Sequence, residues 1–137
     1  MATQVSDLLG GERVLGITLH SNLDLVHATR QGLPARSAVE LAEIIGAAPE
    51  RLTGTLANVM LRGTGRLTPP ESDAIVRIAQ ALAKAIDVLG DRQKAAHWLI
   101  SPNRALGGET PLNLLDTSAG AHEVETILDR IEYGVYS

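Results

Sequence analysis

The sequence predicts an all-α fold, and three observations support this prediction. Apolar residues make up 45% of the 137-residue chain and include no Phe; a core of small and branched aliphatic side chains favours close helix packing. These residues recur at helical spacing, and no alternating strand pattern of useful length appears. Glycine, proline and capping residues separate the periodic segments from one another.

The first segment, residues 1–20, is weakly patterned and rich in glycine. We expect an N-terminal arm or a short lead-in helix there. The next segment begins at Ser21 or Asn22, and either residue can cap a helix that ends at Gly32. On one side of this helix we expect Leu23, Val26 and His27.

Two further helices are predicted before residue 66. Pro34 opens a helix over residues 35–45 that ends at Gly46, and its apolar positions are Ala38, Leu41, Ala42 and Ile45. Pro49 suits the first turn of the other helix, which holds Leu52, Leu56, Val59 and Met60. Two glycines break this helix, Gly63 and Gly65.

The clearest helix start is Thr68-Pro69-Pro70-Glu71, which matches a capping box with proline at the first helical position. The Thr hydroxyl and the Glu carboxylate can each accept a hydrogen bond from a free backbone N–H at the helix start. The helix ends at Gly90, and its apolar stripe consists of Ile75, Ile78, Ala79, Leu82, Ile86 and Leu89.

Three shorter elements complete the chain. Asp91 caps a helix that ends near Trp98-Leu99, and residues 102–108 form a loop. Thr110-Pro111 starts a helical turn through Leu115. A final helix, over about residues 120–132, ends before Gly134, with one face formed by Val124, Ile127, Leu128 and Ile131.

The charge is distributed unevenly along the chain. Residues 1–66 carry six acidic and six basic side chains, whereas residues 67–137 carry ten acidic and six basic ones. The whole net charge of −4 is therefore C-terminal. A nucleic-acid-binding protein usually presents a basic face, and none is obvious here.

Residues 38–57 nevertheless fit a helix-turn-helix spacing, with Gly46 at the turn. A structural αα-hairpin has the same pattern, and both interpretations stay open. The would-be recognition helix carries Gly54 in its middle and is poor in cations. Its candidate DNA contacts are Arg51, Asn58, Arg62 and Arg66.

The sequence offers no basis for catalysis. The four histidines are scattered, and no cysteine, metal-binding motif or phosphate-binding loop appears. We therefore expect no catalytic residue, no metal and no cofactor. The lack of cysteine, of a secretory signal and of an apolar segment long enough to span a membrane leads us to expect a cytoplasmic protein.

All three aromatic residues lie near the C-terminus, at Trp98, Tyr133 and Tyr136. Aromatic side chains often supply the energy of protein interfaces, so this region is a candidate contact surface. It also contains ordered motifs: Gly65-Arg66-Leu67-Thr68-x-x-Glu71-Ser72-Asp73, Trp98-Leu99, Pro102-Asn103-x-Ala105-Leu106-Gly107-Gly108, Thr110-Pro111-Leu112-x-Leu114-Leu115-Asp116-Thr117 and Arg130-Ile131-x-x-Gly134-Val135-Tyr136.

With these motifs, residues 66–137 resemble the toxin-binding domain of the Xre/MbcA/ParS antitoxins. The resemblance implies a non-enzymatic antitoxin of a type II toxin–antitoxin pair. Its partner would be a RES-domain toxin that degrades NAD or ADP-ribosylates a protein. Many members of the family also carry an N-terminal helix-turn-helix and repress their own operon. Here the segment from Gly46 to Gly65 looks longer than theirs and poor in arginine.

We expect the chain to divide into an arm (1–20), a helix-turn-helix-like region (21–66) and a toxin-binding domain (67–137). The end of the last helix and the tail would enter the NAD cleft of the toxin, where a tyrosine ring and a terminal carboxylate match the base and the pyrophosphate. The expected toxin contacts are Arg130, Glu132, Tyr133, Gly134, Val135, Tyr136 and Ser137. The expected supporting residues are Trp98, Pro102, Asn103, Leu106, Gly107, Gly108, Pro111, Leu112 and Asp116.

Two other functions remain open at this point: a DNA-binding repressor with operator DNA as its partner, and a structural adaptor without a toxin. We also expect a homo-oligomer, such as a dimer, because an alanine-rich helix face permits close approach of two helices. This face consists of Ala79, Ala81, Ala83 and Ala85. A monomer in which the same alanines are buried is the alternative.

Overall fold

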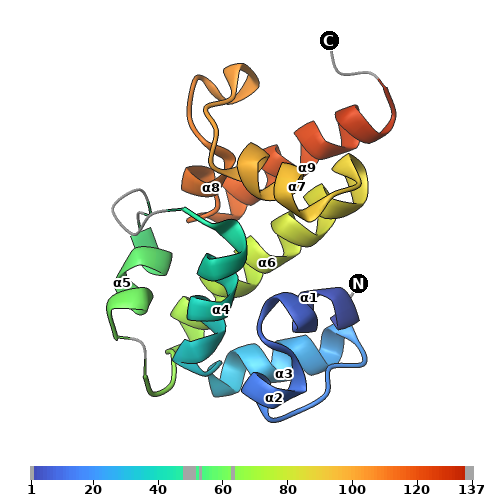
Figure 1. The fold of residues 1–137 in the computed structure, drawn as a ribbon. Helices are drawn as coiled ribbons and strands as arrows, with labels where there is room; N and C mark the ends of the chain where they lie inside the picture. The colour runs from blue at the N-terminus through green and yellow to red at the C-terminus, as the bar shows by residue number, and fades with distance from the viewer. Residues whose placement is uncertain (1, 48–51, 53, 63, 135–137) are drawn as a thin grey trace.

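The computed structural model of the protein describes residues 2–47, 52, 54–62 and 64–134. Across these ranges it contains helices and one isolated antiparallel bridge, between Pro34 and Arg66, but no strand. The predicted all-α fold is confirmed. In chain order (Figure 1) the described helices are α1 (Ala2–Leu8), α2 (Gly11–Leu15), α3 (Asn22–Gln31), α4 (Ala35–Ile45), α5 (Gly54–Arg62), α6 (Pro69–Leu89), α7 (Arg92–Leu99), a 3₁₀ helix (Arg104–Leu106), α8 (Pro111–Leu114) and α9 (Ser118–Glu132).

Helix α6 is the centre of the fold. Its 21 residues pack against α1, α3 and α5 from the N-terminal half of the chain and against α7 and α9 from the C-terminal half. Figure 1 shows it crossing the molecule between the α1–α3 group and the α7–α9 group. Helix α6 buries nine side chains, among them Ile75 and Leu82, which are fully enclosed. The two halves of the described chain therefore share one apolar core.

The first residues of the chain belong to this core. The sequence predicts either an arm or a short lead-in helix over residues 1–20. The structure shows helix there, in two short pieces, α1 and α2. Val5, Leu8 and Leu9 are buried, and α1 packs on α6. The division of the chain into three domains stays a prediction.

Helix α3 has the predicted ends but not the predicted buried face. Ser21 caps it by accepting a hydrogen bond from the Asp24 backbone N–H, and Gly32 ends it. However, Leu23 and Val26 are exposed, and the buried side chains are Leu25 and Ala28. Apolar residues occur on both sides of this helix, so periodicity alone did not identify the face that packs on α6.

Helices α4 and α5 form the αα-hairpin that the sequence predicts, although α5 is shorter than expected. Helix α4 buries its whole predicted stripe. Helix α5 begins at Gly54, and the expectation that this glycine lies in mid-helix is wrong. Gly54 has a φ of +68°, a left-handed conformation that an α-helix interior excludes. The predicted role of Pro49 lies outside the described residues.

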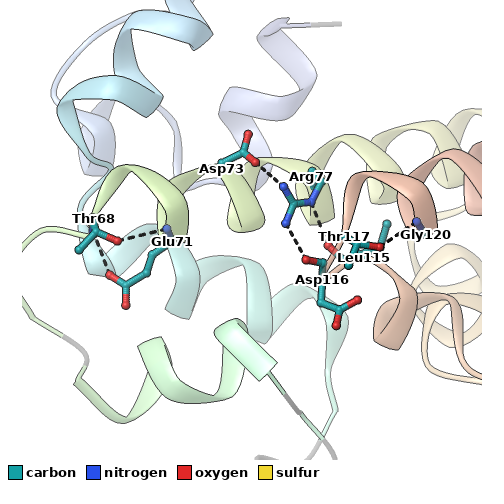
Figure 2. Close-up of polar contacts among 8 residues, drawn as sticks. All are labelled: Thr68, Glu71, Asp73, Arg77, Leu115, Asp116, Thr117 and Gly120. Atoms are coloured by element: carbon teal, nitrogen blue, oxygen red, sulfur yellow. Dashed lines mark hydrogen bonds and ion pairs between the residues drawn. The ribbon is translucent and has the colours of Figure 1, made fainter.

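The start of α6 is the capping box that the sequence predicts. The Thr68 hydroxyl accepts a hydrogen bond from the Glu71 backbone N–H at 3.2 Å, and the Glu71 carboxylate accepts one from the Thr68 backbone N–H at 2.9 Å (Figure 2). Arg62, the last residue of α5, donates to the same carboxylate at 2.7 Å. The end of α5 is thereby tied to the beginning of α6.

A second connection joins the α6 start to the turn between α3 and α4. The backbone N–H of Ala35 donates to the Gly65 carbonyl, and that of Leu67 donates to the Leu33 carbonyl, both at 2.8 Å. The two segments approach closely at Gly32, where a β-carbon would lie 2.3 Å from the Leu67 carbonyl oxygen. Only glycine fits there, since Gly32 also has a φ of +92°.

The alanine-rich face of α6 is used within the chain. Ala79, Ala83 and Ala85 have no exposed surface, and Ala81 is half-buried. Small side chains at these positions let neighbouring helices approach α6 closely. This matches the monomer alternative for the alanines, and the predicted homo-oligomer stays a prediction that needs another surface.

We expect Glu71→Gln to weaken the dependence of folding stability on pH. The hydrogen bond from the Thr68 backbone and the contact with Arg62 lower the pKa of Glu71 from its ordinary value of 4.5. The unfolded chain therefore binds this proton more readily, so the carboxylate stabilises the fold above pH 4.5 and loses this effect as the pH falls through its folded pKa. Gln keeps the neutral hydrogen bond but carries no charge to lose.

The measurement is the urea-unfolding free energy between pH 7 and acid pH. Glu71→Gln should be less stable than the wild type at pH 7 and should lose less stability below pH 4.5. Glu43→Gln, an exposed change on α4, is the control and should follow the wild-type curve. Parallel pH profiles for all three proteins would contradict the assigned role of Glu71.

Candidate functional site

The segment between α7 and α8 is built around Asn103. This side chain is buried, and its Oδ1 accepts a hydrogen bond from the Ala105 backbone N–H at 2.9 Å. The Asn103 backbone donates to the Glu109 carbonyl and accepts from the N–H groups of Leu106 and Gly108, each at 3.0 Å. The predicted loop is therefore ordered by one asparagine and contains a short 3₁₀ helix.

The other predicted supporting residues occupy different environments. Pro111 and Leu112 are buried, and Trp98 and Leu106 are half-buried against the core. Pro102, Gly107, Gly108 and Asp116 are exposed. Thr110 caps α8 as predicted, since its hydroxyl accepts a hydrogen bond from the Asn113 backbone N–H at 3.1 Å.

Arg77 on α6 positions the start of α9, and the sequence analysis missed it. Its guanidinium donates to the Leu115 carbonyl at 3.0 Å and to the Asp116 carbonyl at 3.1 Å, and it also pairs with Asp73 one turn earlier on α6 (Figure 2). The next residue, Thr117, caps α9 through the Gly120 backbone N–H at 3.0 Å. Asp116, a residue of the C-terminal motifs, thus contacts α6 through its backbone.

Gly120 explains how closely α8 and α9 meet. A β-carbon at this position would lie 1.8 Å from the Leu114 carbonyl oxygen, which is backbone and has no room to move. The only sequence signals for these two features were an Asp–Arg pair at helical spacing and a glycine inside a helix. Neither signal indicates its partner in space.

Lys84 on α6 holds the middle of α9. Its ammonium group contacts Asp129 at 2.5 Å and Glu125 at 3.4 Å. Burial alone would lower the pKa of Lys84, but the hydrogen bonds and negative charges of Asp129 and Glu125 outweigh it and raise the pKa. The lysine therefore stays charged and ties α9 to α6 beside the buried side chains of Val124 and Leu128.

The last turn of α9 is exposed. Arg130, Glu132, Tyr133 and Gly134 all lie at the surface, and Gly134 leaves the helix with a φ of +70°. The Tyr133 ring is 74% exposed, although it is the largest apolar side chain of this turn. Val135, Tyr136 and Ser137, the other predicted toxin contacts, lie outside the described residues.

Two of the four candidate DNA contacts bind the chain itself. Arg62 pairs with Glu71 at 2.7 Å, and Arg66 donates to the Gly32 carbonyl at 2.7 Å. Asn58 is exposed on α5, and Arg51 lies outside the described residues. The hairpin of α4 and α5 therefore presents few cations for phosphate contacts.

Two kinds of feature are absent from the described residues. No group of three or more His, Asp or Glu side chains there is arranged to hold a metal ion. No described helix is long and apolar enough to cross a membrane.

Comparison with known proteins finds a family match for the region that contains α7, α8 and α9. Residues 84–134 match the family described as the antitoxin Xre/MbcA/ParS C-terminal toxin-binding domain. This part of the chain is therefore similar to a toxin-binding domain of that family. The match begins at Lys84 and ends at Gly134, so it includes only the last residues of α6, from Lys84 to Leu89, together with the exposed end of α9.

Three curated relatives agree with this assignment, and each is named Antitoxin Xre. The protein from Photorhabdus laumondii is 42% identical over 76 residues, which is 55% of this chain and 51% of the relative. That from Yersinia enterocolitica is 42% identical over 74 residues, with 53% and 50% covered. That from Pseudomonas putida is 40% identical over 68 residues, with 50% and 43% covered.

The chain spans about half the length of the curated relatives it matches. The predicted resemblance to this family is confirmed. The family description is that of a toxin-binding domain, and the relatives are named as antitoxins, in agreement with the prediction that the chain is not an enzyme.

We expect Arg77→Ala to destabilise the fold by about 1–3 kcal/mol, because the Leu115 and Asp116 carbonyls would lose their donor next to the core. Urea unfolding monitored by Trp98 fluorescence measures this loss. Arg77→Lys should recover little of it, since one ammonium group does not reproduce the two-carbonyl contact. Arg92→Ala on α7, an exposed arginine, is the control and should change stability by less than about 0.5 kcal/mol. Equal stability of Arg77→Ala and the wild type would contradict the role of Arg77.

Proposed function

We propose that this chain is the antitoxin of a type II toxin–antitoxin pair and neutralises a RES-domain toxin by binding it directly. The observation that carries the proposal is the match of residues 84–134 to a toxin-binding domain. The Antitoxin Xre relatives support it. The choice of a RES-domain toxin follows from the family resemblance of the C-terminal motifs.

The proposed mechanism is occlusion of the toxin's active site by the end of α9 and the tail. An NAD cleft accepts an aromatic base and an anionic pyrophosphate. The last turn of α9 offers one group for each, the exposed Tyr133 ring and the exposed Glu132 carboxylate. Tyr136 of the tail would add a second ring.

The fold supports this mechanism because α9 is held rigidly. Arg77 fixes its first residues, Lys84 its middle, and the buried side chains of Val124, Ile127 and Leu128 its length. A helix held at these three points presents its last turn in a defined direction, so little conformational entropy is lost when that turn is immobilised by a partner.

The experiment that tests the proposal uses the RES-domain protein encoded beside this gene, if one is present. We expect the full chain to inhibit its NAD consumption at a stoichiometric ratio. Deletion of residues 133–137 should restore toxicity while the far-UV circular dichroism and the unfolding midpoint stay close to wild type, because the helices of the core remain. Neutralisation by the deleted chain at equal concentration would contradict tail occlusion.

A point substitution separates the contribution of Tyr133 to toxin binding from that of the residues that follow it. Tyr133→Ala should weaken toxin binding by roughly thirtyfold or more, because an aromatic anchor at an interface contributes about 2 kcal/mol. Leu61→Ala on α5 is a matched control, since Leu61 is also a large exposed apolar residue but lies outside the toxin-binding domain. Isothermal titration calorimetry measures both affinities, and equal losses for the two variants would contradict the anchor role of Tyr133.

A further inference from the structure

A groove of about 520 Å³ lies between α6 and α9 and is open to solvent. Ala81 and Val88 on α6 and Ala121 on α9 contribute apolar side chains to it. Tyr133, 74% exposed, stands at the α9 end of the groove. Most of its lining residues fall within residues 84–134, the toxin-binding domain.

The cations of this groove are already used by the fold. The side chains of Arg77 and Lys84 are only 17% and 22% exposed. Arg77 is held by Asp73 and two carbonyl groups, and Lys84 is held by Asp129 and Glu125. Neither cation is directed at a partner from outside.

The carboxylates, by contrast, face solvent. Glu125 is 61% exposed and Asp129 is 47% exposed, even though both contact Lys84. Asp87 and Glu132 also line the groove and are exposed. Four carboxylates against two enclosed cations give the groove a negative potential that an approaching partner would meet.

This combination fits one kind of side chain. An arginine or a lysine can lay its aliphatic stem on the apolar side chains while its charged head reaches the carboxylates. The exposed Tyr133 ring adds a face for a cation–π contact at the same end. An anionic ligand would meet repulsion there, and a purely apolar segment would leave the carboxylates without partners.

We propose that the α6–α9 groove receives a basic segment of the toxin, with an arginine or a lysine seated between α6 and Tyr133. This inference rests on the proposed function and adds a second contact to it. The last turn of α9 and the tail would block the active site, and the groove beside that turn would grip a positively charged segment at the edge of the same site. Two contacts that form together raise the affinity above that of either one alone.

The test compares two double variants with the same net charge. Asp87→Asn/Glu125→Gln neutralises two groove carboxylates that have no part in the proposed active-site contact, while Asp129 still holds Lys84 at 2.5 Å. Glu43→Gln/Glu123→Gln is the matched control; both of its residues are exposed, and neither lines the groove. Affinity for the neighbouring RES-domain protein is measured by calorimetry at low and at high salt, and circular dichroism checks the fold of each variant.

We expect the groove variant to bind about tenfold more weakly than the wild type at low salt and to lose less affinity than the wild type when salt is added. The control should stay within about twofold of the wild type, as expected for charges that change only the long-range field.

Equal affinity of the groove variant and its control, with wild-type binding intact, would overturn the groove proposal and leave the antitoxin proposal standing. Absence of binding by the wild-type chain would overturn the antitoxin proposal and the groove proposal with it. Should the groove hold a second copy of this chain instead, the free wild-type protein would sediment as a dimer and the groove variant as a monomer, a result that also overturns toxin docking.

Discussion

The burial of α6 is the constraint on which the rest of the structure depends. A helix that packs on five others has few exposed positions, so its side chains must be small wherever two helices approach from opposite sides. The fully enclosed alanines Ala79, Ala83 and Ala85 meet this requirement. A larger side chain at these positions would force a neighbouring helix outward, and α9 is one of those neighbours.

Polar contacts then fix how the other elements sit along α6. At its first turn, Glu71 accepts hydrogen bonds from Thr68 and Arg62 and thereby joins α5 to α6. Further along, Arg77 binds the residues that precede α9, and Lys84 binds α9 itself. Apolar packing alone would let α9 slide or rotate on α6, whereas these directional contacts define one position for its last turn.

The elements that follow local rules were predictable from the sequence. The capping box at Thr68, the N-cap at Asp91 and the apolar stripe of α4 depend on residues close together in the chain, and all three are confirmed. The face of α3 was predicted wrongly because the choice between Leu25 and Val26 is made by a contact with α6, more than forty residues away in the sequence.

In the candidate site, too, local features were predictable from the sequence and contacts between distant residues were not. The family motifs predict its residues, and residues 84–134 match the toxin-binding domain of the family that the sequence resembles. The role of Arg77 could not be predicted from the sequence. The groups it binds are the main-chain carbonyls of Leu115 and Asp116, and every residue type has such a carbonyl. Likewise, spacing alone did not show that Arg62 and Arg66 bind the chain itself.

Charge pairing explains why the acidic surface lies where it does. The side chains of Arg77 and Lys84 are mostly enclosed, because they bind the residues before α9 and α9 itself. The carboxylates that pair with them therefore lie around them at the surface. The contacts that hold α9 on α6 therefore also leave Glu125 and Asp129 exposed toward solvent. Phosphate groups are repelled from such a surface, whereas a positively charged protein surface is attracted at distances up to roughly a Debye length. In this region the contacts that fix the last helix also give the groove between α6 and α9 its negative charge.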